Sequence, residues 1–154
     1  MALAGLSTLG VKLGYAVGAT QPESFTELTR INSIGGISLS TEAIDASALV
    51  DDVTRRVAGR ADTDETLPIT INATDATIAE WESVITAFNG LTTGQEIWFE
   101  VYHPRLTKGF FFKAEPPKKL PMPEMGQNQL LTMEINVVVT EYVGMATAVA
   151  PTTT

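Results

Sequence analysis

The stretch GGISLSTEAIDASALVDDVTRRVAGRADTDETLPITIN, residues 35–72, raises the question that decides the fold. At its start Ile37 and Leu39 share one face, and residues 67–73 alternate apolar and polar side chains in the same way, which is typical of strands. Between them, residues 48–66 carry both signs of charge and few large apolar side chains. We expect a long charged loop there. Loops beyond about 12–15 residues are uncommon unless they are functional or disordered, so this one needs an explanation.

Strand-like segments also dominate the rest of the chain. They are residues 11–17, 25–31, 95–103, 108–114 and 130–143. The last is the clearest, because apolar residues occupy every second position from Leu131 to Val139 and mostly polar residues lie between them. Such a one-sided pattern fits an antiparallel sheet with one face on a core and the other in water.

One segment has helical periodicity instead, residues 77–89. Its apolar residues at helical spacing are Ile78, Trp81, Ile85 and Phe88. Thr77 and Glu80 match the Thr-x-x-Glu capping box that starts many helices. We therefore predict a mainly β protein: an antiparallel β-sandwich or half-barrel with one packed α-helix over about 77–89.

The length of 154 residues suits one domain. We assign it to residues 1–143, with residues 144–154 as a flexible Thr-rich tail. The four prolines in residues 114–129 predict a stiff connection between two strands, since proline cannot donate to a central ladder.

Composition excludes several classes of function. The net charge of −8 disfavours nucleic-acid binding, and the absence of cysteine excludes disulfides and thiolate chemistry. No stretch has the roughly 20 apolar residues needed to cross a membrane, and the N-terminus lacks the features of a secretory signal. We expect a soluble protein made in a cytoplasm.

No catalytic, cofactor-binding or metal-binding set stands out. His103 is the single histidine and follows an aromatic strand, so we interpret it as a strand-end residue. The acidic residues of the charged loop do not have the spacing of an EF-hand, and arginines lie among them, which favours a solvated, salt-bridged loop over a calcium site. No glycine-rich phosphate loop or Gly-x-Ser-x-Gly elbow is present.

Charge placement is more informative than total charge. Residues 103–119 are basic, whereas the charged loop leans acidic around a cluster of arginines. Complementary patches on one chain allow identical copies to bind head to tail, which produces rings or open filaments. The alternative is that both regions are simply solvated loops.

The run 35–72 resembles the major tail tube proteins of long-tailed bacteriophages. Glu42, Ile44, Asp45 and Ser47 match a Glu-x-Ile-Asp-x-Ser/Thr phrase, and Arg55, Arg56 and Gly59 match the charged loop after it. Residues 67–72 match the strand that follows, and the helix, the aromatic strand and the long last strand come in the expected order.

This resemblance implies a tail-tube fold and hexameric rings stacked into a hollow tube. It implies a virion tail assembled in the host cytoplasm, with tape-measure, terminator and tail-tip proteins as partners. DNA would pass through without specific binding. The alternatives are a tube or tail-completion protein of a contractile tail or type VI-like secretion system, and a non-viral β-sandwich binding module.

Within that reading we assign two sets of site residues. Contacts between subunits or rings are expected at Asp51, Asp52, Arg55, Arg56, Arg60, Asp62, Asp64, Glu65, Arg105, Lys108, Lys118 and Lys119. The channel wall is expected at Ser38, Ser40, Glu42, Thr70, Asn72, Thr132, Glu134, Asn136 and Thr140. An acidic and hydroxyl-rich wall gives phosphate no cation to bind.

Overall fold

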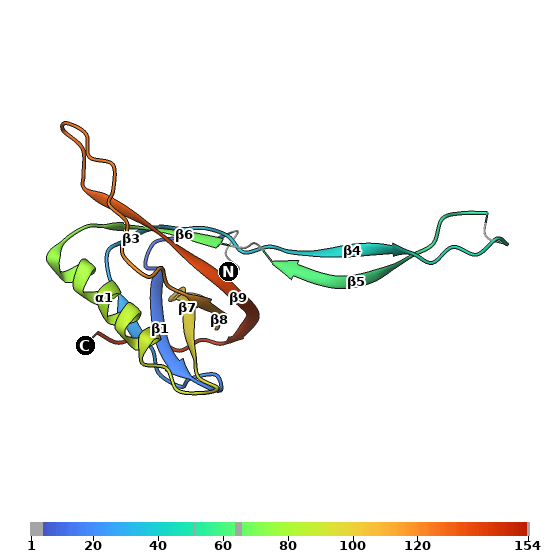
Figure 1. Cartoon of the computed structure of the whole chain (residues 1–154), viewed down its shortest axis with the longest axis horizontal. Coiled ribbons are helices and arrows are strands. Elements are labelled where there is room, and N and C mark those ends of the chain that lie inside the picture. Colours follow the sequence, from blue (N-terminus) through green and yellow to red (C-terminus); the bar gives the residue numbers. More distant parts are fainter. Residues whose placement is uncertain (1–4, 51, 64–65, 154) are drawn as a thin grey trace.

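The computed structural model describes residues 5–50, 52–63 and 66–153, without the side chains of residues 40–42 and 59–63. Over these ranges the chain forms one helix and nine strands (Figure 1). They are β1 (Lys12–Gly18), β2 (Thr26–Leu28), β3 (Ile31–Ile34), β4 (Leu39–Asp45), β5 (Arg56–Thr63), β6 (Thr66–Asn72), α1 (Asp75–Asn89), β7 (Glu96–Tyr102), β8 (Lys108–Glu115) and β9 (Thr132–Thr147).

Seven of the strands form a single antiparallel sheet in the order β2-β1-β7-β8-β9-β6-β3. The sheet curls around its core, and α1 lies across the open side of the curl (Figure 1). The architecture is the predicted one: mainly β and antiparallel, with one packed helix.

Alternation along β6 and β9 builds the core as predicted. In β6, Leu67, Ile69 and Ile71 are buried, and in β9 the buried residues are Met133, Ile135, Val137 and Val139. Leu131 is the exception, because it precedes β9 and is 42 % exposed. Burying a side chain of this size contributes about 1.5–3 kcal/mol, so these two strands anchor the fold.

The helix begins earlier than its sequence pattern predicts. Thr74 is the N-cap, and Thr77 occupies the third helical position, from which its hydroxyl accepts the backbone N–H of Thr74 at 2.9 Å. The capping box is therefore Thr74 and Thr77, not Thr77 and Glu80. Trp81, fully buried, stacks on Phe99 of β7 with ring centroids 6.3 Å apart, which fixes the helix over the sheet.

The charged segment of residues 48–66 is not a loop throughout, so the prediction of a long charged loop was wrong. Residues 56–63 form β5, which pairs with β4 in a separate two-stranded sheet. This hairpin, residues 39–63, is hereafter the arm, and it extends away from the body along the long axis of the molecule (Figure 1). The physical reason is backbone pairing with β4, which needs no apolar side chains from β5.

The end of the chain also differs from the expected flexible tail. β9 continues to Thr147, beyond the boundary at residue 143, and Pro151 is buried. The backbone N–H of Thr152 donates to Phe25 O at 3.0 Å, and the N–H of Glu27 donates to Thr152 O at 2.9 Å. The C-terminal segment is therefore packed on β2 and the segment before it.

Candidate functional site

The arm is held at its base and at its tip. At the base, the N–H of Gly35 donates to Pro68 O at 2.8 Å. Near the tip, the N–H of Arg55 donates to Ser47 Oγ at 2.8 Å and the N–H of Ala46 donates to Arg55 O, also at 2.8 Å. The two bonds near the tip join the ends of the loop at Ala46, Ser47 and Arg55.

The tip presents apolar side chains to solvent. Leu49, Val50 and Val53 are 107 %, 89 % and 71 % exposed, and Ile44 and Val57 behind them are about half exposed. Isolated two-stranded hairpins are marginally stable, and exposed apolar patches mark interaction sites. These apolar residues were not singled out from the sequence, because the charged residues around them dominate the segment. Their short Ala-Leu-Val cluster was the signal available.

The arm also carries part of the predicted charged set. Asp52, Arg55 and Arg56 are exposed, and Arg56 lies opposite Asp45 in the hairpin register. The N–H of Ser47 donates to Asp45 Oδ1 at 2.9 Å, which lowers the pKa of that carboxyl. Asp51, Asp64 and Glu65 lie outside the described residues, as do the side chains of Arg60 and Asp62.

The predicted basic region is divided by a strand. Arg105 and Lys108 lie at one end of β8, and Lys118 and Lys119 follow its other end. The strand from Lys108 to Glu115 spans about 23 Å between them, so they are two exposed patches, not one. Lys113, between them, binds Glu96 at 2.8 Å and Glu141 at 2.9 Å.

The predicted channel residues of β6 and β9 lie together on one face. Thr70 is opposite Glu134 in the register, and Asn72 is opposite Thr132. Both strands bury the alternate positions, so these side chains point out of the body. Asn136 and Thr140 are exposed farther along β9. β6 and β9 thus share a polar face, which the exposed Val138 interrupts between Asn136 and Thr140.

The polar face extends onto β3. Asn32 Nδ2 donates to Asn72 Oδ1 at 2.6 Å, and Ser33 is opposite Thr70. Ser38 is exposed just before β4. Ser40 and Glu42 were also assigned to the channel, but their side chains are not among those that the structure describes.

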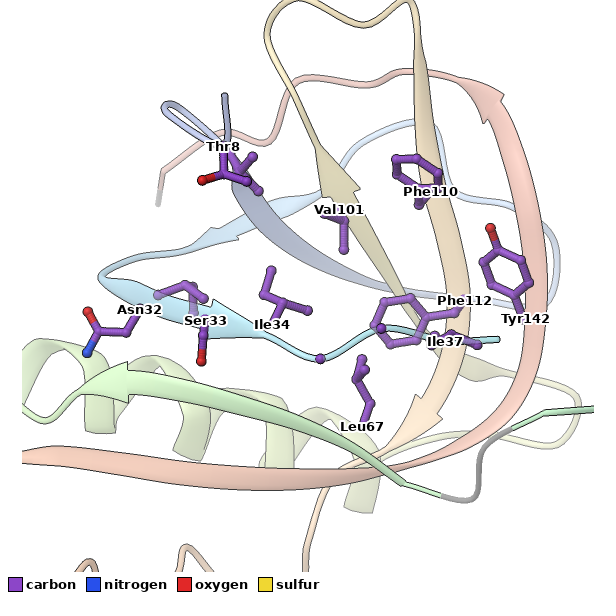
Figure 2. Close-up of a pocket in the computed structure, with 14 residues that line it drawn as sticks. Thr8, Asn32, Ser33, Ile34, Ile37, Leu67, Val101, Phe110, Phe112 and Tyr142 are labelled. Atoms are coloured by element: carbon purple, nitrogen blue, oxygen red, sulfur yellow. The ribbon is translucent and has the colours of Figure 1, made fainter. Parts of the chain in front are cut away.

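A hollow of about 610 Å³ opens between the β3 segment and the strands β7 to β9 (Figure 2). Ile34, Leu67, Val101 and Phe112 point into it, and its lining is mainly apolar. Among the residues that line the hollow, Tyr142 has the one titratable side chain. Among the described residues, no group of three His, Cys, Asp or Glu side chains could hold a metal ion. The hollow therefore offers apolar volume rather than a set of reactive groups.

His103 is a structural residue. It is 9 % exposed, its Nε2 lies 2.6 Å from Ser7 O, and its Nδ1 accepts the N–H of Arg105 at 3.1 Å. Since Nδ1 accepts, Nε2 carries the proton and donates to Ser7 O. The imidazole thus ties the N-terminal segment to the β7–β8 turn.

Within the described ranges, no helix combines the length and apolar character needed to cross a membrane.

No protein-family model and no curated protein matches the chain. Solved structures do share its fold. A chain of the sheath/tube terminator of the PVC extracellular contractile injection system is 12 % identical, with a TM-score of 0.64 over 95 % of this chain and 99 % of that one. A chain of the tail of an empty GTA particle, refined with C6 symmetry, is 12 % identical, with a TM-score of 0.60 over 94 % and 99 %.

A third likeness is to a chain of the PVC sheath–tube complex in its extended state. It is 12 % identical, with a TM-score of 0.60 over 94 % of this chain and 93 % of that one. These likenesses establish the fold over nearly the whole chain and confirm the predicted fold class. They come from a GTA tail and contractile injection systems, and so are not specific to long-tailed phages.

Proposed function

We propose that this chain is the subunit of a tail tube, in which rings of identical copies stack into a hollow conduit. The arm carries this proposal. It leaves the body, exposes Leu49, Val50 and Val53 at a hydrogen-bonded tip, and belongs to a fold shared with chains of tail and tube assemblies. A second copy is the partner that would bury such a tip without an additional protein.

The finer assignments follow from the sequence resemblance. We place the tube in a long-tailed phage virion, built in the host cytoplasm from hexameric rings, with tape-measure, terminator and tail-tip proteins as its other partners. The C6 symmetry applied to the GTA tail supports six copies in a ring. The arm and the exposed basic residues of the β8 ends would make contacts between copies, and the polar face of β6 and β9 would line the channel.

A ring-forming terminator or completion protein of a contractile system is the second candidate. The likeness to a chain of the PVC sheath/tube terminator favours it, and the anti-feeding prophage cap also contains a chain of this fold. Such a protein would form single rings that do not lengthen with concentration, whereas a tube subunit would form filaments that do.

Negative-stain microscopy of the purified chain over a range of concentrations separates these candidates. We expect hollow tubes of uniform width. Isolated rings at every concentration would support the terminator. A monomer at every concentration would contradict both assemblies and favour the free β-sandwich binding module.

A variant of the arm tip then tests the contact. In the triple variant Leu49→Ser, Val50→Ser and Val53→Ser we expect no tubes but an unchanged denaturation curve, because these side chains are exposed in the single copy. The matched control is Met122→Ser with Met125→Ser, two exposed apolar residues on the β8–β9 connection. Loss of tubes in both variants would mean that the tip has no special role.

A further inference from the structure

The outer face of β1, β7 and β8 carries a second apolar cluster, separate from the core under the helix. Phe25, Trp98 and Phe111 are its buried residues, and Val149 packs against it. Residues 148–152, hereafter the strap, run back from the end of β9 and cover this face (Figure 1). Pro151 lies against Gly14, where a side chain would meet the proline ring at 3.1 Å.

A buried carboxyl lies under the strap. Glu100 of β7 is fully buried, and its Oε2 accepts the backbone N–H of Val149 at 2.8 Å. Among the described residues, its Oε1 has no hydrogen-bond partner. Gly109 of β8 leaves the room for this carboxyl, since a Cβ there would lie 2.5 Å from Oε2.

We propose that the strap is a releasable latch, which closes over Glu100 when the carboxyl holds its proton and opens when the proton is lost. An ionised carboxylate with one oxygen unsatisfied is costly to bury, and opening the strap lets water reach it. The neutral acid still accepts the N–H of Val149 through its carbonyl oxygen. Opening would uncover the apolar cluster of Phe25, Trp98 and Phe111.

The charged neighbours do not neutralise Glu100. The residues that share its face on the surrounding elements are Lys12 of β1, Glu27 of β2, Glu96 and Tyr102 of β7, and Lys113 of β8. Lys113 already binds Glu96 and Glu141, and Lys12 is exposed. The strap has no ionisable side chain. Burial therefore dominates and raises the pKa of Glu100, against the smaller lowering effect of the Val149 N–H.

The direction of the pH effect follows from this raised pKa. The closed strap binds the proton more tightly than the open one, so closure is favoured fully below the ordinary carboxyl pKa. Closure of the strap is weakened as the pH rises from the ordinary carboxyl pKa to the raised pKa of Glu100. Between these two values, the opening equilibrium rises up to about tenfold per pH unit, because one proton is released per opening.

Hydrogen exchange of the full chain, corrected for the intrinsic effect of pH and followed from about pH 5 to about pH 9, tests the latch. We expect the peptide with residues 148–153 to lose protection as the pH rises, while peptides from β7 and β9 keep theirs. Glu100→Gln, which keeps an acceptor and cannot ionise, should hold the strap closed throughout. The control Glu134→Gln, on the exposed face of β9, should follow the wild type.

Three results would overturn the proposal: strap protection that does not change with pH, strap and body losing protection together, or a pH response retained in Glu100→Gln. If Glu100→Gln does not fold, the wild-type series still decides, because strap and body peptides are compared within one chain. None of these results depends on tube assembly, so the latch and the proposed function can fail separately.

Discussion

Glu80 connects the helix to the segment between β2 and β3. Its Oε2 accepts the N–H of Thr29 at 2.8 Å, and its Oε1 accepts the Thr29 hydroxyl, also at 2.8 Å. This pair explains why the capping prediction failed at Glu80. The partner is 51 residues away, so no local pattern could show that this carboxylate belongs to a tertiary contact rather than to the cap.

We expect Glu80→Ala to lower the free energy of unfolding by about 1–3 kcal/mol, because it leaves the part-buried Thr29 N–H without its acceptor. Urea denaturation measures this loss. Glu82→Ala is the matched control, since Glu82 is exposed on the same helix and should change stability by no more than about 0.5 kcal/mol. Equal losses in the two variants would show that the Thr29 contact contributes nothing specific.

At the scale of elements, β9 shows how far alternation can be read from sequence. The pattern holds from Met133 to Val139, and then two register shifts against β8 interrupt it, at Thr140 and Val143. Each extra residue reverses which side of the sheet the next side chains face. Tyr142 therefore packs on the main core, which a constant period of two could not predict. After the second shift the original alternation returns, and Ala146 packs on the outer cluster.

Gly144 directly follows the second shift, and its φ is +104°. We expect Gly144→Ala to destabilise the chain by about 1–3 kcal/mol, since a residue with a Cβ rarely adopts this backbone conformation. Thermal unfolding provides the measurement. Gly36→Ala is the control, because that position has open space and no positive φ, and it should be neutral or slightly stabilising. A neutral Gly144→Ala would mean that β9 can bend without glycine.

The arm was predicted as a functional segment but not as a hairpin. β5, with the sequence RVAGRADT, has too few apolar residues to alternate and contains residues that strands disfavour. Its strand conformation comes from pairing with β4, which composition does not encode. The charge pattern therefore indicated where the arm lies in the sequence. The hairpin structure of the arm and the exposure of its apolar tip are known only from the structure.

We expect Arg55→Glu with Arg56→Glu to block tube growth while the single copy stays folded. Both side chains are exposed at the arm, and reversing them turns attraction toward acidic groups of a neighbouring copy into repulsion. Sedimentation measures assembly, and circular dichroism measures folding. Lys12→Glu with Arg30→Glu makes the same change in net charge at exposed body positions and should still assemble. Normal tubes from the arm variant would place the contact elsewhere.

At the scale of the whole molecule, sequence indicated the fold class but not the strand order. β1 pairs with β7 and β3 with β6, and these pairings bring together segments that no local signal connects. The two basic patches show the same limit. They are close in sequence and lie at opposite ends of β8. The polar face was predictable because both of its long strands alternate without interruption through the segment that forms it.

That polar face leads to a prediction about DNA. Glu134 is exposed on β9, opposite Thr70 of β6, with Thr132 and Asn136 beside it on the strand. If the face lines the tube, every subunit presents a carboxylate and neutral polar groups to passing DNA, and none of these binds phosphate. A lysine at this position would place a ring of cations along the wall, each able to contact a phosphate and release counterions.

We expect Glu134→Lys to assemble normally but to make tubes that bind a short labelled duplex in a co-sedimentation assay, and to slow DNA ejection from particles. Binding should weaken steeply with salt, since each phosphate contact adds to the slope of log affinity against log salt. The control Glu124→Lys changes charge equally on the exposed β8–β9 connection, and it should bind far less DNA. Equal binding by both variants, or none by intact Glu134→Lys tubes, would show that β6 and β9 do not face the channel.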